Sequence, residues 1–187
     1  MTPIDAGTLA AERHRFFLAT RGAVVFPTIG TLLWLSLGGA GFLLSPRAWC
    51  AAVLVLAALI TPAAIILFRK LVARLEIKSS LATLILPALL PVALSLGTAL
   101  AAFWTDPSLV PLVIVIGLAS HWPAVGWMFD TPIYWLHSVV RVALAVALWF
   151  LLPDGRFTWL PLSIGGVYAA TALLVWRELH RAESGSR

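Results

Sequence analysis

The residues best able to do chemistry lie in one stretch of the sequence, between His121 and Arg141. The stretch contains two histidines and the one arginine inside an expected span, with Asp130 at the turn between two spans. Tyr134, His137, Ser138 and Arg141 are spaced i, i+3, i+4 and i+7, so they share one face of a helix. Imidazole, phenol and guanidinium groups on a common face could attract an anion, orient a polar solute or relay protons.

These groups are also expected at similar depths in a membrane. Counted from the centres of the expected spans, four of them fall on the cytoplasmic side of the midplane, within ~6 Å of one another in depth. These four are Arg141, His121, His137 and Tyr168. With Tyr134 they are the expected solute-binding residues, around a polar cavity centred on Arg141.

Arg141 is the most informative of these residues. An arginine at the centre of a bilayer costs at least ~2.5–3.5 kcal/mol on insertion scales, and no Asp or Glu lies inside an expected span. Asp130 is ~16 Å away along a continuous helix. Two alternatives follow. Either Arg141 bridges helices through neutral acceptors, such as Ser120, Ser138, Tyr168, neutral His121 and the carbonyls freed near Pro123, or it binds an anion that is not part of the protein.

Other chemistries are disfavoured by the same sequence. Two histidines could ligate a metal or haem, but the remaining ligands of such a site are missing. Ser138 beside His137, and Ser120 beside His121, point ~100° apart on a helix and do not form a nucleophile–base pair. Cys50 is the only cysteine, which excludes an internal disulfide and a cysteine-pair metal site. We expect no catalytic residue, no metal and no cofactor, and lean away from an enzyme.

The elements that position these side chains must be membrane helices. Residues of the set AVILMFWYC make up 61% of the 187 residues, and charged residues make up 11%, against about 25% in a typical soluble domain. So few charges cannot cover a soluble fold of this size. The composition excludes a disordered chain, a secreted disulfide scaffold and an ordinary cytosolic enzyme.

Charged residues other than Arg141 divide the chain into six largely apolar runs of at least 20 residues, enough to cross a core of ~30 Å as helices. Helices are required because lipid offers no partners to backbone groups, and the alternation typical of β-barrel strands is missing. We therefore expect one all-α domain, a transmembrane bundle of six spans with short tails. The spans are approximately 23–44, 48–68, 80–103, 108–129, 132–152 and 157–176, and the tails are 1–21 and 178–187.

The positions of Lys and Arg predict how the bundle is oriented in the membrane. With six spans, ten of them share one side: Arg13, Arg15, Arg21, Arg69, Lys70, Arg74, Lys78, Arg177, Arg181 and Arg187. Only Arg47 and Arg156 fall on the other side. The positive-inside rule then places both termini in the cytoplasm. The net charge of +5 therefore indicates orientation, and we expect no nucleic-acid partner.

Tryptophans are expected at both membrane surfaces, because indole rings favour the headgroup zone. Six fall at expected span ends: Trp49, Trp104 and Trp159 outside, and Trp127, Trp135 and Trp176 inside. Residues 8–19 are expected either as a short helix on the inner surface, with Leu9, Phe16 and Phe17 in lipid, or as a simple cytoplasmic extension of the first span.

Two features inside the spans concern packing. Pro87 and Pro91, one turn apart, predict a bend in the third span. Small residues concentrate at 36–41 and at 165–170, where helices can approach closely. Close packing within one bundle is the expected use of these residues, and the face of a homo-oligomer is the alternative.

Three stretches carry a resemblance to a known family: the P-x-x-x-x-x-F-R-K end of the second span, from Pro62 to Lys70, the G-L-x-S-H-W-P stretch of the fourth, and the face from Tyr134 to Arg141. Over about residues 15–155 the chain resembles an uncharacterised bacterial family of short six-span integral membrane proteins. The resemblance implies no catalytic residues. The expected location is a bacterial cytoplasmic (inner) membrane.

Three functions remain open at this point. The first is a small transporter or channel-like protein for an anionic or polar solute, held near Arg141. The second is a structural or assembly subunit of a membrane complex, with no ligand of its own. The third is a membrane enzyme acting on a lipid head group or quinone, which the missing intramembrane carboxylates disfavour. The lipid bilayer is the expected partner in all three.

Overall fold

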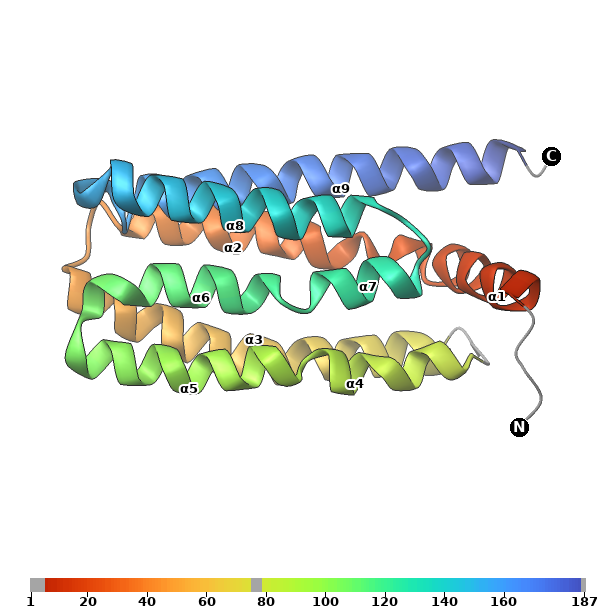
Figure 1. Cartoon of the computed structure of the whole chain (residues 1–187), viewed down its shortest axis with the longest axis horizontal. Coiled ribbons are helices and arrows are strands. Elements are labelled where there is room, and N and C mark those ends of the chain that lie inside the picture. Colours follow the sequence, from red (N-terminus) through yellow and green to blue (C-terminus); the bar gives the residue numbers. More distant parts are fainter. Residues whose placement is uncertain (1–5, 75–78, 186–187) are drawn as a thin grey trace.

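The structure is a computed structural model that describes residues 6–74 and 79–185. Every regular element within those ranges is helical. Figure 1 shows long helices lying roughly side by side, with both chain ends at the same end of the bundle. The bounds of the helices are α1 (Ala6–Ala19), α2 (Val25–Ala40), α3 (Pro46–Arg74), α4 (Ile85–Ala88), α5 (Leu90–Thr105), α6 (Val110–Ala119), α7 (Trp122–Met128), α8 (Ile133–Leu151) and α9 (Trp159–Gly185). Four 3-10 turns join them: η1 (Arg21–Ala23), η2 (Ser80–Leu84), η3 (Pro107–Leu109) and η4 (Pro153–Gly155).

Five helical stretches of the described residues are long and apolar enough to cross a membrane: Arg21–Ala40, Ser80–Thr105, Pro107–Met128, Ile133–Leu151 and Trp159–Ser184. Helix α3 adds a shorter apolar section, Pro46–Ile60. The chain is therefore all-helical, with several helices compatible with a membrane protein. Helix α9 continues to Gly185, through most of the stretch that was expected to be a tail.

Prolines interrupt two of these stretches. Helix α4 ends at Ala88 and α5 begins at Leu90, so the helix is interrupted at Leu89, between Pro87 and Pro91, where the sequence predicts a bend. Helices α6 and α7 are separated at Ser120 and His121, just before Pro123. Proline has no N–H to offer a carbonyl one turn back, so each break frees backbone acceptors inside the bundle.

Helices α2 and α9 pack closely because glycines lie where the two helices meet. A Cβ added at Gly38 would lie 2.5 Å from Cγ of Leu162, and one at Gly165 would lie 2.7 Å from Cδ2 of Leu35. By contrast, a Cβ at Gly39 would meet nothing within 4 Å. The predicted use of small residues for packing within the bundle is thus confirmed at Gly38 and Gly165.

Helix α1 is a separate helix at one end of the bundle, joined to α2 through η1 (Figure 1). All three residues of η1, between α1 and α2, have φ between 51° and 59°, a region that L-residues other than Asn and Asp rarely adopt. Phe16 and Phe17 are buried in protein and pack against the ring of Phe129. The expectation that these two side chains lie in lipid is wrong, because the turn at η1 gives the aromatic face of α1 a protein partner.

Trp49 differs from the other tryptophans expected at span ends because it is wholly buried in protein. Its Nε1 donates to the carbonyl of Leu37 at 2.8 Å, and its ring meets Phe157 edge-on. The other tryptophans expected at span ends are exposed: Trp104, Trp127, Trp135, Trp159 and Trp176.

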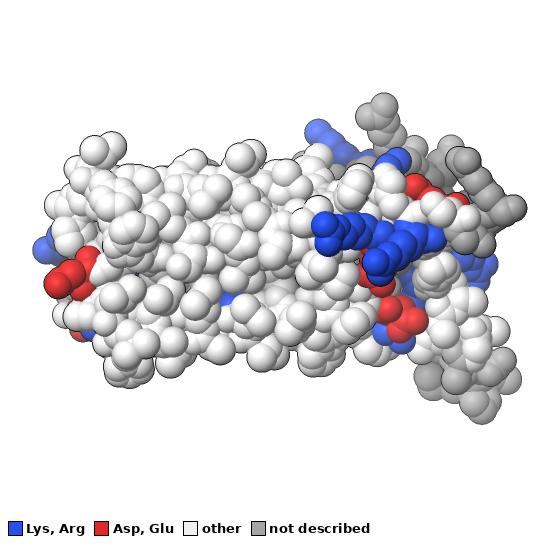
Figure 2. All heavy atoms as spheres, turned by 90° about the horizontal axis from the view of Figure 1, so that it is seen from above, with Lys and Arg blue, Asp and Glu red and all other residues white. Residues whose placement is uncertain are grey.

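Charge is concentrated at one end of the molecule. Figure 2 shows Lys and Arg gathered at the end that carries α1, and a long uncharged surface beyond it. Arg47 and Arg156 lie toward the opposite end, where their guanidinium groups pack over Trp104 and Trp149. Lys78, Arg187 and the side chain of Arg74 lie outside the described residues.

Candidate functional site

Arg141 lies at the centre of the bundle, wholly buried on α8. Its Nη1 donates to the carbonyl of Leu118 at 3.2 Å and to the hydroxyl of Tyr168 at 2.6 Å. Its guanidinium carbon lies 5.4 Å from the ring centroid of Trp34 and 5.0 Å from that of Tyr168. Arg141 therefore connects α8 to α6, α9 and α2 through neutral oxygens and aromatic rings, the interactions that stabilise a buried cation without a carboxylate.

The break in α6 supplies acceptors for two side chains of α8. Pro123 cannot donate to the carbonyl of Ala119, and Ser138 Oγ donates to that carbonyl instead, at 3.0 Å. Arg141, one turn further along α8, reaches the neighbouring carbonyl of Leu118. Of the neutral acceptors expected for Arg141, a carbonyl shortly before Pro123 and the hydroxyl of Tyr168 are thus confirmed, whereas Ser138 bonds Ala119 instead.

His137 is fixed by a helix-to-helix hydrogen bond. Its Nδ1 lies 2.8 Å from Thr171 Oγ1 on α9, and the Thr171 hydroxyl donates to the carbonyl of Val167, also at 2.8 Å. Because that hydroxyl has only one proton, the ring nitrogen is the donor of the pair. The His137 ring also packs edge-on against Trp122 and Tyr168, with centroids 5.0 and 4.6 Å away.

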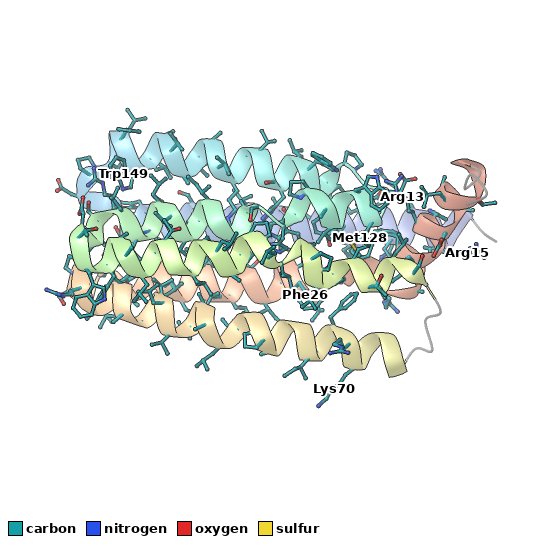
Figure 3. The ribbon with its side chains drawn as sticks, turned by 60° about the horizontal axis from the view of Figure 1, so that its bottom comes forward. Arg13, Arg15, Phe26, Lys70, Met128 and Trp149 are labelled. Atoms are coloured by element: carbon teal, nitrogen blue, oxygen red, sulfur yellow. The ribbon has the colours of Figure 1, made fainter. Side chains whose placement is uncertain are left out.

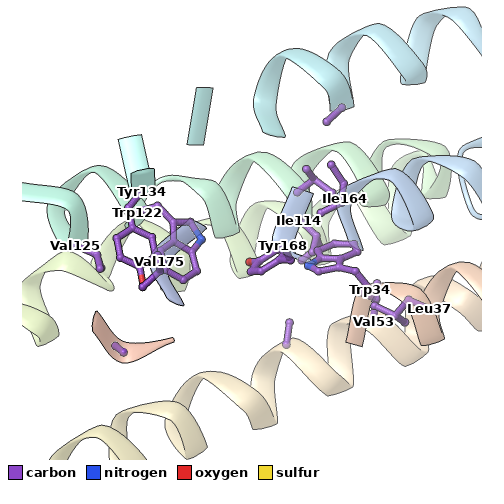
Figure 4. Packing of buried hydrophobic residues seen from close by; sticks show 14 of the residues in the cluster. Trp34, Leu37, Val53, Ile114, Trp122, Val125, Tyr134, Ile164, Tyr168 and Val175 are labelled. Carbon is purple, nitrogen blue, oxygen red and sulfur yellow. The ribbon is translucent and has the colours of Figure 1, made fainter. Parts of the chain in front are cut away.

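Tyr134 points away from Arg141, toward the turn between α1 and α2. Its hydroxyl donates to the carbonyl of Gly22 in η1 at 2.6 Å. Its ring stacks on Trp122, with centroids 4.9 Å apart and planes 13° from parallel (Figure 4). Tyr134 is thus connected to the other expected site residues only through the ring of Trp122.

His121 stands at the break between α6 and α7, with its ring 4.7 Å from that of Trp122. Together with Trp122, His137, Arg141 and Tyr168 it forms what we call the polar cluster. Within the described part of the chain, five buried nitrogens of this cluster have no hydrogen-bond partner: His121 Nδ1, Trp122 Nε1, His137 Nε2, Arg141 Nε and Arg141 Nη2. The cluster therefore has hydrogen-bonding capacity that the described residues do not use.

Beside the polar cluster lies a half-open chamber of about 300 Å³. Its lining comes from α2, α3, α4, α5, α6, α7 and α9 and the turns between them: Ala23, Phe26, Ile29, Gly30, Leu33, Trp34, Ile60, Ala63, Leu67, Phe68, Ile85, Leu89, Val92, Leu118, His121, Trp122, Val125, Phe129 and Tyr168. This volume is at the small end of the range of ~300–1,000 Å³ for small-molecule sites. It is about twice that of an apolar cavity that binds benzene.

The chamber and the polar cluster share one wall. His121, Trp122 and Tyr168 belong to both, whereas Arg141 and His137 do not line the chamber. The lining is otherwise almost entirely apolar. Of the five expected site residues, the structure brings four together, and only two of the five line the chamber. A polar cavity around Arg141 stays a prediction.

Sequence reasoning missed three residues of this site. Trp122 is the ring on which His121, His137 and Tyr134 all pack, and its position directly after His121 was the available signal. Thr171 follows Tyr168 by one helical turn on α9 and so shares its face. Trp34 offered no signal, because nothing in the sequence pairs α2 with Arg141.

Nothing in the described residues resembles a metal site, since they hold no group of three or more His, Cys, Asp or Glu that could bind an ion. A family model matches residues 9–178, which include every residue of the polar cluster and the chamber. The chain belongs to the DUF7010 family. DUF7010 is described as a family of unknown function. No curated protein and no solved structure matches the chain.

Membership in DUF7010 assigns no activity to the polar cluster or to the chamber. The match to the family model covers nearly the whole bundle, from within α1 to within α9, rather than one pair of helices. The function must therefore be argued from the site itself.

Proposed function

We propose that this DUF7010 protein is an integral membrane protein of six spans, with both termini in the cytoplasm. Helix α3 is the sixth span in this proposal, because its 29 residues would extend about 43 Å as a continuous helix. The concentration of Lys and Arg at the end with both termini supports the orientation, by the positive-inside rule. The proposed location is a bacterial cytoplasmic membrane.

We propose further that the protein binds a small ligand inside the bundle, as a small transporter or channel-like protein does. The observation that supports this most strongly is the chamber of about 300 Å³ beside the polar cluster. Protein interiors are close-packed and contain few voids larger than a water molecule. A concave apolar space with a few polar groups on one wall is typical of a ligand site.

In this proposal the wall residues and the residues behind them have different roles. Tyr168, His121 and Trp122 contact the ligand. Arg141 and His137 hold Tyr168 in place, one through its hydroxyl and the other through its ring. Binding of a free anion at Arg141 is a separate prediction, for which Nε and Nη2 would be the donors.

A structural or assembly subunit is the second candidate, and a specific observation favours it. Arg141 and Ser138 together connect α8 to three other helices. Interhelical hydrogen bonds of this kind stabilise membrane bundles without any ligand. In that case the chamber is a consequence of how α3 packs and has no occupant of its own.

Thermal unfolding of the purified protein in detergent separates the two candidates. A panel of inorganic anions, uncharged polar solutes and short-chain lipids would be added to the wild type and to Ala63→Phe, which narrows the chamber. Ala58→Phe is the matched control, because Ala58 is exposed on the same helix and does not line the chamber. A ligand at about 100 times its Kd stabilises the folded state by about 2.7 kcal/mol.

A compound that raises the unfolding temperature of the wild type and of Ala58→Phe, but not of Ala63→Phe, is the result that the ligand-binding proposal expects. Arg141→Gln is measured beside them. If no compound shifts any variant, and Arg141→Gln alone unfolds at a much lower temperature, the structural candidate replaces the ligand-binding one. If an anion raises the unfolding temperature of every variant except Arg141→Gln, its binding site is at Arg141.

A further inference from the structure

The chamber opens to the side, between α2 and α3. Among its lining residues, Ile29 on α2 is 40% exposed, and Leu67 on α3 is 44% exposed. Ala63, one turn before Leu67, is exposed as well. The opposite wall is sealed, since Val92 and Trp122 are only 1% and 4% exposed. In a membrane, an opening between two spans faces lipid and not water.

The chemistry of the lining selects the kind of molecule that can enter. Close to the opening every side chain is a hydrocarbon or an aromatic ring: Phe26, Ile29, Leu33, Ile60, Ala63 and Leu67. A small ion would lose its hydration there and find no charged partner, because Arg141 does not line the chamber. A hydrocarbon chain has no hydration to lose when it moves from the bilayer into such a space, and it makes close contacts there.

Charge complements the opening at its cytoplasmic end. Arg69 and Lys70 follow Leu67 and Phe68 directly on α3, and both are exposed. Figure 3 shows Phe26 between α2 and α3, and Lys70 further along α3 toward the end that carries α1. Lys70 lies ~10 Å along the helix from Ala63. Two cations at this distance from an apolar opening match a lipid whose phosphate stays at the surface while its chain reaches inward.

Resting on the ligand-binding function proposed above, we infer that the ligand is an anionic phospholipid of the cytoplasmic leaflet. One of its hydrocarbon chains enters between α2 and α3 and fills the chamber as far as Trp122 and Val92. Its phosphate is held by Arg69 and Lys70. The polar cluster then meets the inner part of the chain through the rings of Trp122 and Tyr168.

Photo-crosslinking in reconstituted vesicles tests this inference. The probes are phosphatidylglycerol and phosphatidylcholine with a diazirine in the middle of one acyl chain, each added to vesicles of unlabelled phosphatidylcholine that contain the full chain. After irradiation, mass spectrometry of peptides locates the adducts. Val92, Phe68 and Trp122 report the chamber, because they are shielded from surrounding lipid, whereas Leu32 and Val55 are exposed and report that lipid.

We expect adducts at the shielded chamber residues with phosphatidylglycerol, in the wild type and in Ala58→Phe, and at least a five-fold loss in Ala63→Phe. The double variant Arg69→Gln/Lys70→Gln should lower the chamber adducts several-fold. The control Arg177→Gln/Arg181→Gln, which removes two exposed cations of α9 at the same end, should leave them unchanged. Adducts confined to exposed residues such as Leu32 and Val55 would overturn the inference, and equal chamber labelling by the two probes would overturn the anionic head group.

Failure of this inference is distinguishable from failure of the ligand-binding function. If chamber residues are not labelled but a compound of the unfolding panel stabilises the wild type and not Ala63→Phe, the chamber binds another class of ligand. If neither result is obtained, the ligand-binding function fails with the inference.

Discussion

Nη1 of Arg141 on α8 donates a hydrogen bond of 2.6 Å to the hydroxyl of Tyr168 on α9. The guanidinium also lies 5.0 Å from the Tyr168 ring centroid. Tyr168 in turn lines the chamber, and Arg141 does not. Tyr168, together with Trp34, which also lines the chamber and lies over the guanidinium, therefore separates a buried cation from an apolar cavity. The residues expected from the sequence to form one site thus fall into two groups. Arg141 supports Tyr168 from behind, and Tyr168 lines the chamber.

Removing the hydroxyl of Tyr168 should destabilise the protein more than removing that of Tyr134. Tyr168→Phe deletes an acceptor of a charged donor, a bond that contributes about 1.5–3 kcal/mol, whereas Tyr134→Phe deletes a neutral bond to Gly22 that contributes about 0.5–1.5 kcal/mol. Both changes are the same in chemistry, so each is the control for the other. Denaturant unfolding in detergent measures both. Equal losses would show that the charge of Arg141 does not depend on Tyr168.

A methyl group added to α2 should have opposite effects at two glycines. The Cβ of Gly30→Ala would overlap the ring of Tyr168 and force it to move, at a cost of about 1–3 kcal/mol. Gly39→Ala meets nothing within 4 Å and should gain about 0.5–1 kcal/mol from its helix preference. Denaturant unfolding in detergent measures the change in stability for both variants. A stabilised Gly30→Ala would mean that α2 and α9 are not packed as described.

The attachment of α1 should weaken in acid. Ser79 Oγ donates to Glu12 Oε1 at 2.7 Å and Ser80 Oγ at 3.3 Å, which lowers the pKa of the Glu12 carboxyl below its usual value. The stabilisation is therefore complete above the usual pKa and is lost as the pH falls through the lowered one. A spin label at the exposed position of Ala10, in a chain with Cys50→Ala, reports the mobility of α1.

The label should become mobile as the pH falls below the usual pKa of Glu and through the lowered pKa of Glu12. Glu12→Gln is the control, and its mobility should not depend on pH in that range. A transition that persists unchanged in Glu12→Gln would assign it to another group.

Asp130 combines a backbone role with an ion pair. Its φ is 53°, and its Oδ1 lies 2.8 Å from Nη2 of Arg13. Asp130→Asn keeps a side chain that tolerates this left-handed conformation and should cost less than about 1 kcal/mol, because the pair is partly exposed. Asp130→Ala should cost about 1–2 kcal/mol more, from backbone strain. Denaturant unfolding compares the stabilities of the two variants. An equal loss of stability in both would mean that the loss comes from the ion pair alone, with no contribution from backbone strain.

The sequence predicts the all-α architecture because the length of each apolar run, and the charges at its ends, depend only on residues within that run. It also predicts that Arg141 has no carboxylate within reach, and so either bonds neutral acceptors or binds an external anion. The structure supplies neutral acceptors in Leu118 and Tyr168. The bend at Pro87 and Pro91 follows from backbone chemistry alone. These expectations need no knowledge of which helices are neighbours.

The remaining features depend on packing between distant segments. Phe16 and Phe17 are expected from the sequence to face lipid. In the structure the turn at η1 places their rings against Phe129, which is more than 100 residues away in sequence. Trp34 lies next to Arg141 because α2 and α9 pack closely at their glycines. The chamber arises where α3 diverges from α2, and no local pattern encodes that divergence.

Native mass spectrometry tests the central claim, a ligand chamber inside the bundle, most directly. The wild type, Ala63→Phe and Ala58→Phe would be purified from membranes and released from detergent under identical mild conditions. We predict a discrete adduct on the wild type and on Ala58→Phe that is missing from Ala63→Phe. An adduct that is equally abundant on all three variants, or on none, would contradict the claim that the chamber binds a ligand.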